Sequence, residues 1–228
     1  MNIPTTTLKA VLFDMDGVLY NSMPYHAQAW HEAMEAHGYQ FSYEEAFLHE
    51  GRTGAGTINI AHRRQYGTDA TPEQIEQIYA DKCRAFARFP EAQPMPGARA
   101  LIEQIMAAGI QTVLVTGSGQ RTLLERLAHD YPGAFDAAHM VTAFDVKYGK
   151  PHPEPYLMGL SKAGISATEA IVVENAPIGV QAAKAAGVYT IAVNTGPLDA
   201  QLLLDAGADA LFPSMQALSE GFFKLLDS

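Results

Sequence analysis

The chain has 228 residues, 48% of them hydrophobic and 18% charged, a length and composition that can bury a sizeable globular core. Its formal net charge of −10 makes nucleic acid an unfavourable partner, and no apolar run approaches the roughly 20 residues of a membrane span. The single cysteine excludes an internal disulfide, and the first residues lack the basic and apolar regions of a signal peptide. We therefore expect a cytoplasmic protein with no nucleic-acid or membrane partner.

The chain begins with one predicted strand and continues with helices. Residues 8–13 are a compact apolar run that predicts a buried strand, and this run ends in the acidic segment 14–17. Helical patterns follow, with helix-start signals at Ser42 and at Thr71 with Gln74. The candidate helices of this stretch cover residues 24–38 and 53–67, and two further helices begin near residues 42 and 71.

From Pro94 onward, helical and strand patterns alternate. The predicted helices cover residues 97–109, 122–130 and 177–187, and the predicted strands cover residues 112–115, 170–173, 189–193 and 210–212. Such alternation predicts an α/β fold with a doubly wound parallel sheet and helices on both of its faces. We expect an α/β core domain formed by residues 1–19 and 94–228, with residues 20–93 inserted as an all-helical cap domain.

Polar residues follow several of the predicted strands. Because ligands of such sheets bind outside the carboxyl ends of the strands, we expect these residues to converge on one site. Lys150 lies in a proline-rich loop that we expect to reach the same place. The strand-end residues are Asp14 and Asp16 after the first strand, Thr116, Gly117 and Ser118 after the strand at 112–115, and Glu174 and Asn175 after the strand at 170–173.

The acidic pair after the first strand indicates a cation site. Asp14 and Asp16 lie two residues apart in extended chain, so both carboxylates face one crevice, where their repulsion requires a cation such as Mg²⁺. One could serve as a nucleophile and the other as an acid/base, although an ordinary Asp-Gly turn explains the pair equally well by itself. Thr116 to Ser118 form a candidate phosphate cradle at a helix start, and Lys150 could neutralise a transferring phosphoryl group.

In this order and spacing, these residues resemble the four motifs of the haloacid dehalogenase (HAD) superfamily, and the resemblance covers essentially the whole chain. It implies a Rossmann-like core in which Asp14 is the nucleophile that forms an aspartyl-phosphate and Asp16 is the acid/base. Thr116 and Lys150 would bind the transferring phosphate. The implied Mg²⁺ ligands are Asp14, the backbone carbonyl of Asp16 and Asn175, with Glu174 nearby.

Two residues depart from the family pattern. Asn175 stands where the last motif usually has a metal-binding Asp, and Glu50 lies in a cap loop that is basic in sugar-phosphate mutases. Since an amide brings no charge to Mg²⁺, we expect cap closure to carry Glu50 to the metal. The insert resembles the C1 cap of the β-phosphoglucomutase subfamily, and its loops are similar to those of the inorganic pyrophosphatase branch. This resemblance implies substrate contacts by His26, Glu50 and Lys82, which lies at the edge of an apolar helix stripe, with Arg52 as a weaker candidate.

The motifs and the cap loop together favour a Mg²⁺-dependent hydrolase that converts inorganic pyrophosphate to phosphate through an aspartyl-phosphate. We expect a monomer, since a capped core of this size needs no partner to complete its site. Two alternatives stay open: a β-phosphoglucomutase, which returns the phosphoryl group to a sugar, and a sugar-phosphate phosphatase of broad tolerance. A non-catalytic binding protein with the HAD fold is a further alternative, which only Asn175 favours.

Overall fold

A six-stranded parallel sheet forms the centre of the computed structural model, which describes residues 7–118 and 121–226. Its strands are β1 (Ala10–Phe13), β2 (Gln111–Val115), β3 (Met140–Val141), β4 (Ala170–Glu174), β5 (Tyr189–Val193) and β6 (Ala210–Phe212). They lie in the order β3-β2-β1-β4-β5-β6, and every neighbouring pair is parallel. The chain builds outward from β1 in both directions, so the carboxyl end of β1 is where such a sheet binds ligands.

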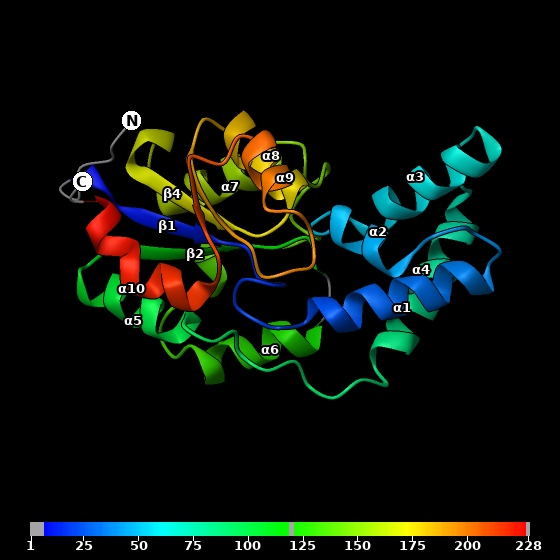
Figure 1. Cartoon of the computed structure of the whole chain (residues 1–228), viewed down its shortest axis with the longest axis horizontal. Coiled ribbons are helices and arrows are strands. Elements are labelled where there is room, and N and C mark those ends of the chain that lie inside the picture. The colour runs from blue at the N-terminus through cyan, green and yellow to red at the C-terminus, as the bar shows by residue number, and fades with distance from the viewer. Residues whose placement is uncertain (1–6, 119–120, 227–228) are drawn as a thin grey trace.

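Helices cover both faces of the sheet (Figure 1). They are α5 (Ala98–Ala107), α6 (Arg121–Asp130) and α10 (Met215–Leu226) on one face, and α7 (Glu154–Ala163) and α8 (Pro177–Ala185) on the other. Side chains of β1 alternate between the two faces: Val11 and Phe13 belong to one buried cluster, and Ala10 and Leu12 to the other. Because both faces are buried, the strand is apolar throughout. The predicted α/β fold with a parallel, doubly wound sheet is confirmed.

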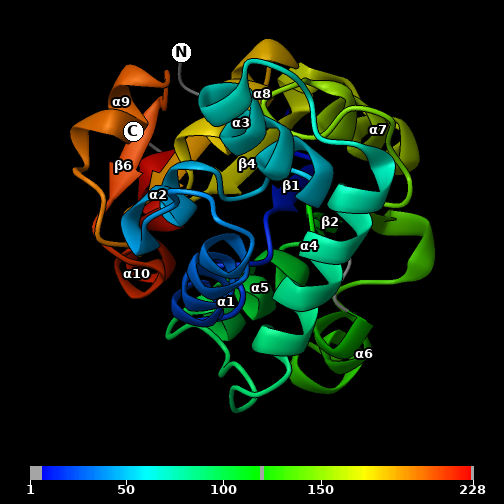
Figure 2. The ribbon, with the colours of Figure 1, turned by 90° about the vertical axis from the view of Figure 1, so that its right-hand side faces the viewer.

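Four helices between β1 and α5 lie together beyond the carboxyl end of the sheet (Figures 1 and 2). They are α1 (Met23–Ala36), α2 (Tyr43–Leu48), α3 (Gly54–Tyr66) and α4 (Pro72–Phe86), and α1 packs against both α2 and α4. The helix-start signals read from the sequence are present. Ser42 accepts a hydrogen bond from the backbone N–H of Glu45, and Thr71 and Gln74 form a reciprocal capping box.

The two links between these helices and the core run side by side. Tyr20 and Pro94 form an antiparallel bridge, and the Asn21 backbone N–H donates to the carbonyl of Gln93 at 2.9 Å. This pairing lies where the sequence divides core from insert. We propose that residues 20–93, called the cap below, move relative to the core on these two links.

The sequence did not predict β3 or α7. Two residues of strand are too few to show a period, and α7 carries Gly159 in its middle, which lowers helix propensity. A Cβ on Gly159 would lie 3.0 Å from side-chain atoms of Leu12 and Val115, so the glycine lets α7 approach the sheet closely. None of the helices within residues 7–118 and 121–226 is long and apolar enough to cross a membrane.

Candidate active site

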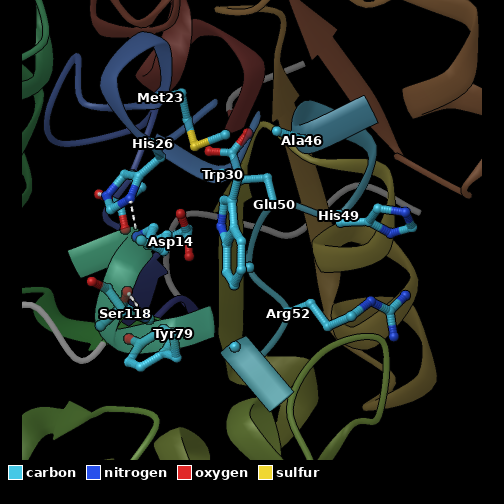
Figure 3. Close-up of a pocket in the computed structure, with 16 residues that line it drawn as sticks. Asp14, Met23, His26, Trp30, Ala46, His49, Glu50, Arg52, Tyr79 and Ser118 are labelled. Atoms are coloured by element: carbon cyan, nitrogen blue, oxygen red, sulfur yellow. Dashed lines mark hydrogen bonds and ion pairs between the residues drawn. The ribbon is translucent and has the colours of Figure 1, made fainter. Parts of the chain in front are cut away.

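A cavity of about 50 Å³ lies between the cap and the carboxyl edge of the sheet (Figure 3). The loops after β1 and β2 form its core side, and α1, α4 and the loop before α3 form its cap side. Lys150, Glu174 and Asn175 do not line the cavity. Lys150 donates hydrogen bonds to Asp14 and Glu174, and Asn175 donates one to Glu50. The predicted residues that line it are Asp14, Asp16, Thr116, Gly117 and Ser118 from the core, and His26, Glu50, Arg52 and Lys82 from the cap.

Asp14 lies just beyond the end of β1, where a buried lysine holds its carboxylate. Lys150 Nζ donates to Asp14 Oδ1 at 2.5 Å, and both residues are 2% exposed. Burial raises the pKa of the Asp14 carboxyl to about 8, because the loss of water outweighs the opposing charge of Lys150. Burial alone would lower the pKa of Lys150, but the carboxylates of Asp14 and Glu174 raise it, so Lys150 stays cationic. The ionised form of Asp14 therefore depends on nearby positive charge.

Asp16 is held by a serine and by two cap side chains in series. Ser22 Oγ donates to Asp16 Oδ1 at 2.6 Å, and His26 Nε2 lies 3.2 Å from the same oxygen. Lys82 Nζ lies 2.7 Å from His26 Nδ1, so the imidazole tautomer that satisfies both contacts carries its proton on Nε2. Burial would raise the pKa of Asp16, but His26, Ser22 and Lys82 together hold it below its usual value. Asp16 is thus kept ionised, the form that accepts a proton.

Lys82 is a buried cation surrounded by aromatic rings. Its Nζ lies 5.4 Å from the ring centre of Trp30, 6.0 Å from that of Tyr79 and 5.1 Å from that of Phe86, and the residue is 3% exposed. Ring faces attract an ammonium but do not hydrate it. Burial lowers the pKa of Lys82 to about 8. The sequence places Lys82 at the edge of an apolar stripe, and the structure buries it because Trp30 of α1 lies beside that edge of α4.

The acidic residue of the cap loop reaches the core. Asn175 Nδ2 donates to Glu50 Oε1 at 2.9 Å, and Glu50 is 5% exposed. Burial, and then the charge of Asp14, raise the pKa of Glu50 well above its usual value. Gly17 leaves room for this contact, because a Cβ there would lie 2.1 Å from Asn175 Nδ2 and 2.9 Å from Glu50 Oε1. Glu50 thus lies beside Asn175, one of the expected metal ligands, and its binding to a metal stays a prediction.

The oxygen atoms gathered here suit a hard divalent cation. Asn175 Oδ1 is buried and has no hydrogen-bond partner among the residues that the structure describes. Asp14 and Glu50 add carboxylates, and the backbone carbonyl of Asp16 is a further candidate oxygen. Within the same described ranges, no three His, Cys, Asp or Glu side chains form a ready metal cluster. A cation at this site would therefore rely on amide, backbone and substrate oxygens as well as on carboxylates.

Glu174 accepts hydrogen bonds from four donors. Its Oε1 accepts from Lys150 Nζ at 2.7 Å and from the Tyr156 hydroxyl at 2.6 Å. Its Oε2 accepts from the backbone N–H groups of Asn175 at 3.0 Å and of Ala176 at 3.3 Å. These contacts use the roughly four acceptor positions of a carboxylate. The sequence places Glu174 among the metal ligands. The structure ties it to Lys150 and to the start of α8, and metal binding by Glu174 stays a prediction.

Two other predicted binding residues have less direct geometry. Arg52 lines the cavity, but in Figure 3 its side chain runs away from Asp14. Thr116 Oγ1 accepts from the Ser118 backbone N–H at 2.9 Å, which closes the turn after β2. Thr116 therefore shapes this loop, and phosphate binding by Thr116, Gly117 and Ser118 stays a prediction.

Sequence reasoning did not identify Ser22, Trp30 or Tyr79 as site residues. Ser22 stands where a helix N-cap is expected, yet its side chain does not cap α1 and instead contacts Asp16. Trp30 and Tyr79 line the cavity from α1 and α4. Their helical spacing is also that of core residues, so only the packing of α1 on α4 shows that they face a ligand-sized space.

The cap loop and the core approach each other backbone to backbone. A Cβ on Gly117 would lie 2.3 Å from the carbonyl oxygen of Gly51, and a Cβ on Gly149 would lie 2.6 Å from Thr53 Cγ2. Contacts this short are open only to glycine. The position of Glu50 over the core therefore depends on glycines in two core loops.

The fold and the site together define a class of enzymes, in which a parallel α/β core presents an aspartate at the end of its first strand beneath an inserted helical cap. The model of the haloacid dehalogenase-like hydrolase family matches residues 8–187, and the chain belongs to this family. The HAD membership expected from the motifs is confirmed, and the protein is an enzyme of that family. Membership of the pyrophosphatase branch stays a prediction.

Several relatives carry names that specify a substrate class. Hexitol phosphatase A of Escherichia coli strain K12 is 34% identical over 188 residues, which cover 82% of this chain and 83% of that enzyme. The phosphorylated carbohydrates phosphatase of Thermotoga maritima is 32% identical over 217 residues, or 93% and 97% of the two chains. A solved structure from Bacteroides vulgatus, provisionally described as a beta-phosphoglucomutase, matches with a TM-score of 0.94 and 54% identity, covering 99% of this chain and 90% of that one. These names favour the sugar-phosphate alternatives over the pyrophosphatase expected first from the sequence.

Proposed function

We propose that the protein is a Mg²⁺-dependent phosphohydrolase that uses Asp14 as its nucleophile. The observation that carries this proposal is the buried Asp14–Lys150 pair, in which Asp14 lines the same small cavity as an Asp16 carboxylate held by Ser22 and His26. Bound Mg²⁺ would offset the negative charge of the phosphate and of the carboxylates around it.

The proposed reaction has two steps. The approach of the anionic substrate raises the pKa of Asp16, so Asp16 takes up a proton from water as the complex forms. An Asp14 oxygen then attacks phosphorus, the bond from phosphorus to the leaving oxygen breaks, and Asp16 gives its proton to that oxygen. Water then attacks the phosphorus of the aspartyl-phosphate, Asp16 takes the proton of the water, and the Asp14 carboxylate is released together with inorganic phosphate. Lys150 orients Asp14 and stabilises the charge on the transferring phosphoryl group, while His26 keeps Asp16 directed at the cavity.

We propose a phosphorylated sugar or polyol as the substrate. The names of the two curated relatives support this class, and each matches at least 82% of the present chain. The aromatic rings of Trp30 and Tyr79 on the cap side of the cavity offer apolar faces to the carbon skeleton of such a substrate. The cap would have to move outward to admit it, since the cavity of about 50 Å³ has room for only about three to five water molecules.

Inorganic pyrophosphate is the second candidate, and one observation favours it. With Glu50 hydrogen-bonded to Asn175, the cavity between the cap and Asp14 is only about 50 Å³, a volume that suits a small anion better than a phosphorylated sugar. Lys82 provides a buried cation on the cap side of this space, where an anionic leaving group would need one.

A substrate panel distinguishes these candidates. We expect Mg²⁺-dependent release of phosphate from hexitol and hexose phosphates, with kcat/KM at least tenfold above that for pyrophosphate, and loss of activity in excess EDTA. A reversed ratio of about 100-fold, equivalent to about 2.7 kcal/mol of transition-state discrimination, would establish pyrophosphate as the substrate. Conversion of β-glucose 1-phosphate to glucose 6-phosphate would indicate a mutase, and absence of metal-dependent turnover with every compound would overturn the hydrolase proposal.

Gly117→Ala is expected to lower kcat/KM at least tenfold and to leave Tm within a few degrees of the wild type. The added methyl group meets the backbone of Gly51, so the cap is held off the core while the core itself is unchanged. Gly38→Ala is the matched control, because nothing lies within 4 Å of a Cβ at Gly38, where φ is +77°. That control should lower Tm slightly and keep kcat/KM. Wild-type kcat/KM in Gly117→Ala would mean that turnover does not need this contact.

A further inference from the structure

Tyr156 is a buried polar residue to which the proposed reaction gives no task. It lies on α7, its exposed fraction is 0%, and its hydroxyl donates to Glu174 Oε1 at 2.6 Å. Its ring also faces the catalytic lysine, with Lys150 Nζ 5.1 Å from the ring centre. A phenylalanine would fill the same space and keep the ring, so the hydroxyl is the part that needs an explanation.

The Lys150 ammonium has no proton to spare. Its Nζ donates to Asp14 Oδ1 at 2.5 Å, to the Val115 carbonyl at 3.1 Å and to Glu174 Oε1 at 2.7 Å. An ammonium carries three N–H donors, and these three acceptors use them all. Asp14 and Glu174 are both carboxylates, so they compete for the position of a single cation.

The Tyr156 hydroxyl weakens the pull of Glu174 on the Lys150 ammonium, because it donates a second hydrogen bond to Glu174 Oε1. Glu174 Oε1 receives two donors, one charged and one neutral, and the neutral donor is Tyr156. Without it, Glu174 Oε1 would be a buried carboxylate oxygen with Lys150 as its one donor among the described residues, and it would draw the ammonium toward itself. The other oxygen is held by backbone N–H groups next to α8, so the carboxylate itself cannot follow.

Gly179 shows how closely this carboxylate is fitted. A Cβ at that position would lie 2.0 Å from Glu174 Oε1 and 2.3 Å from Glu174 Oε2. The carboxylate therefore rests directly on the backbone of α8. Because the Glu174 carboxylate is fixed in place, Lys150 is the group that moves when Glu174 loses the hydrogen bond from Tyr156.

We propose that Tyr156 is a positioning residue that acts through Glu174 to keep Lys150 on Asp14. The inference rests on the proposed function in one respect, the role of Asp14 as nucleophile. It adds a residue outside the cavity to the groups that set the rate, and it gives Glu174 a task other than binding metal.

Tyr156→Phe tests the proposal by steady-state kinetics. We expect kcat to fall about tenfold, the effect of one hydrogen bond to a charged group, with KM changed less than threefold. Tyr131→Phe is the matched control: Tyr131 is also buried, and its hydroxyl also donates to a buried acceptor, the carbonyl of Leu19. Both variants should lose similar stability, and only Tyr156→Phe should lose kcat. Equal kcat in the two variants would overturn the proposal.

A double-mutant cycle tests whether the effect passes through Glu174. In a Glu174→Gln background, which carries no charge to compete for Lys150, Tyr156→Phe should cost less than twofold in kcat. Full additivity of the two substitutions would contradict action through Glu174. If Glu174→Gln does not fold, the single-variant comparison with Tyr131→Phe still decides.

A spectroscopic readout separates this proposal from the proposed function. In protein labelled with ¹⁵N-lysine, Lys150 should give a slowly exchanging ammonium signal, since the residue is 2% exposed. We expect this signal to shift in Tyr156→Phe and to stay in place in Tyr131→Phe, whether or not the correct substrate has been found. An unmoved Lys150 signal in Tyr156→Phe would refute the positioning role, whereas absence of turnover by the wild type would refute only the proposed function.

Discussion

Asp14→Asn is expected to lower kcat by roughly 10⁴-fold or more while the protein stays folded. The amide has the shape of the carboxylate but cannot form the covalent phosphoryl intermediate. Lys150 would keep Glu174 and the Val115 carbonyl as acceptors, so the buried cation is not left alone. Phosphate release, measured with the best compound of the substrate panel, and circular dichroism report the two quantities.

The control for this prediction is Asp69→Asn, an exposed cap residue that pairs with Arg63 and should leave kcat unchanged. Trapping gives a further check: acid quenching of the wild type during turnover should leave phosphate bound to the protein, and Asp14→Asn should show none. Activity of the Asn variant within tenfold of the wild type would remove Asp14 from the nucleophilic role.

Lys82→Met is expected to stabilise the folded protein and to lower its catalytic efficiency. Burial lowers the pKa of Lys82 from 10.5 to about 8, so below pH 8 the folded state carries a charged amine at a cost on the order of 3 kcal/mol. At pH 7 the variant should therefore unfold several degrees above the wild type. Its kcat/KM should fall by roughly 100-fold, because the cap loses a cation directed at the substrate and His26 loses its partner.

The dependence on pH gives the sign of this effect. Between about pH 8 and pH 10.5 the unfolded chain binds more protons at Lys82 than the folded protein, so the wild type gains stability as the pH rises. The advantage of Lys82→Met should be full below pH 8 and should shrink toward pH 10.5. Urea unfolding at several pH values measures it, with the exposed Lys224→Met as a control that changes neither stability nor kcat/KM. If Lys82→Met is less stable than the wild type at pH 7, burial of the charged Lys82 amine does not destabilise the folded protein.

The sequence pattern was enough to predict a parallel sheet, apart from its edge strand β3, and to predict that Asp14, Asp16 and Thr116 lie close together. Strand β1 is apolar on both faces, and parallel strands bring their carboxyl ends to one edge, so Asp14 and Asp16 had to lie near the loop of Thr116. A comparison of charges at two departures from a family pattern predicted that Glu50 reaches the core near Asn175, but not that the two side chains hydrogen-bond directly. These predictions needed only pattern and chemistry.

Other features depend on packing that no local pattern records. Lys82 is buried because Trp30, fifty-two positions earlier, lies beside it, and the helix stripe alone placed it at an edge. The four donors around Glu174 could not be predicted either, because one of them comes from Tyr156 on a helix that the sequence did not predict. The size of the substrate likewise depends on how far the cap opens. That opening is set by the packing of the whole cap on the core, which no single motif records.

Trp30 is the single tryptophan of the chain, and it lines the cavity with its ring 5.4 Å from the Lys82 ammonium. Tryptophan fluorescence from this protein therefore originates at one position, beside the place where the substrate is proposed to bind. An arriving anion or an opening cap changes the charge and the water around that indole, so its emission should follow both events without any added label. Substrate binding and cap opening can therefore be followed in the unmodified enzyme by the fluorescence of Trp30 alone.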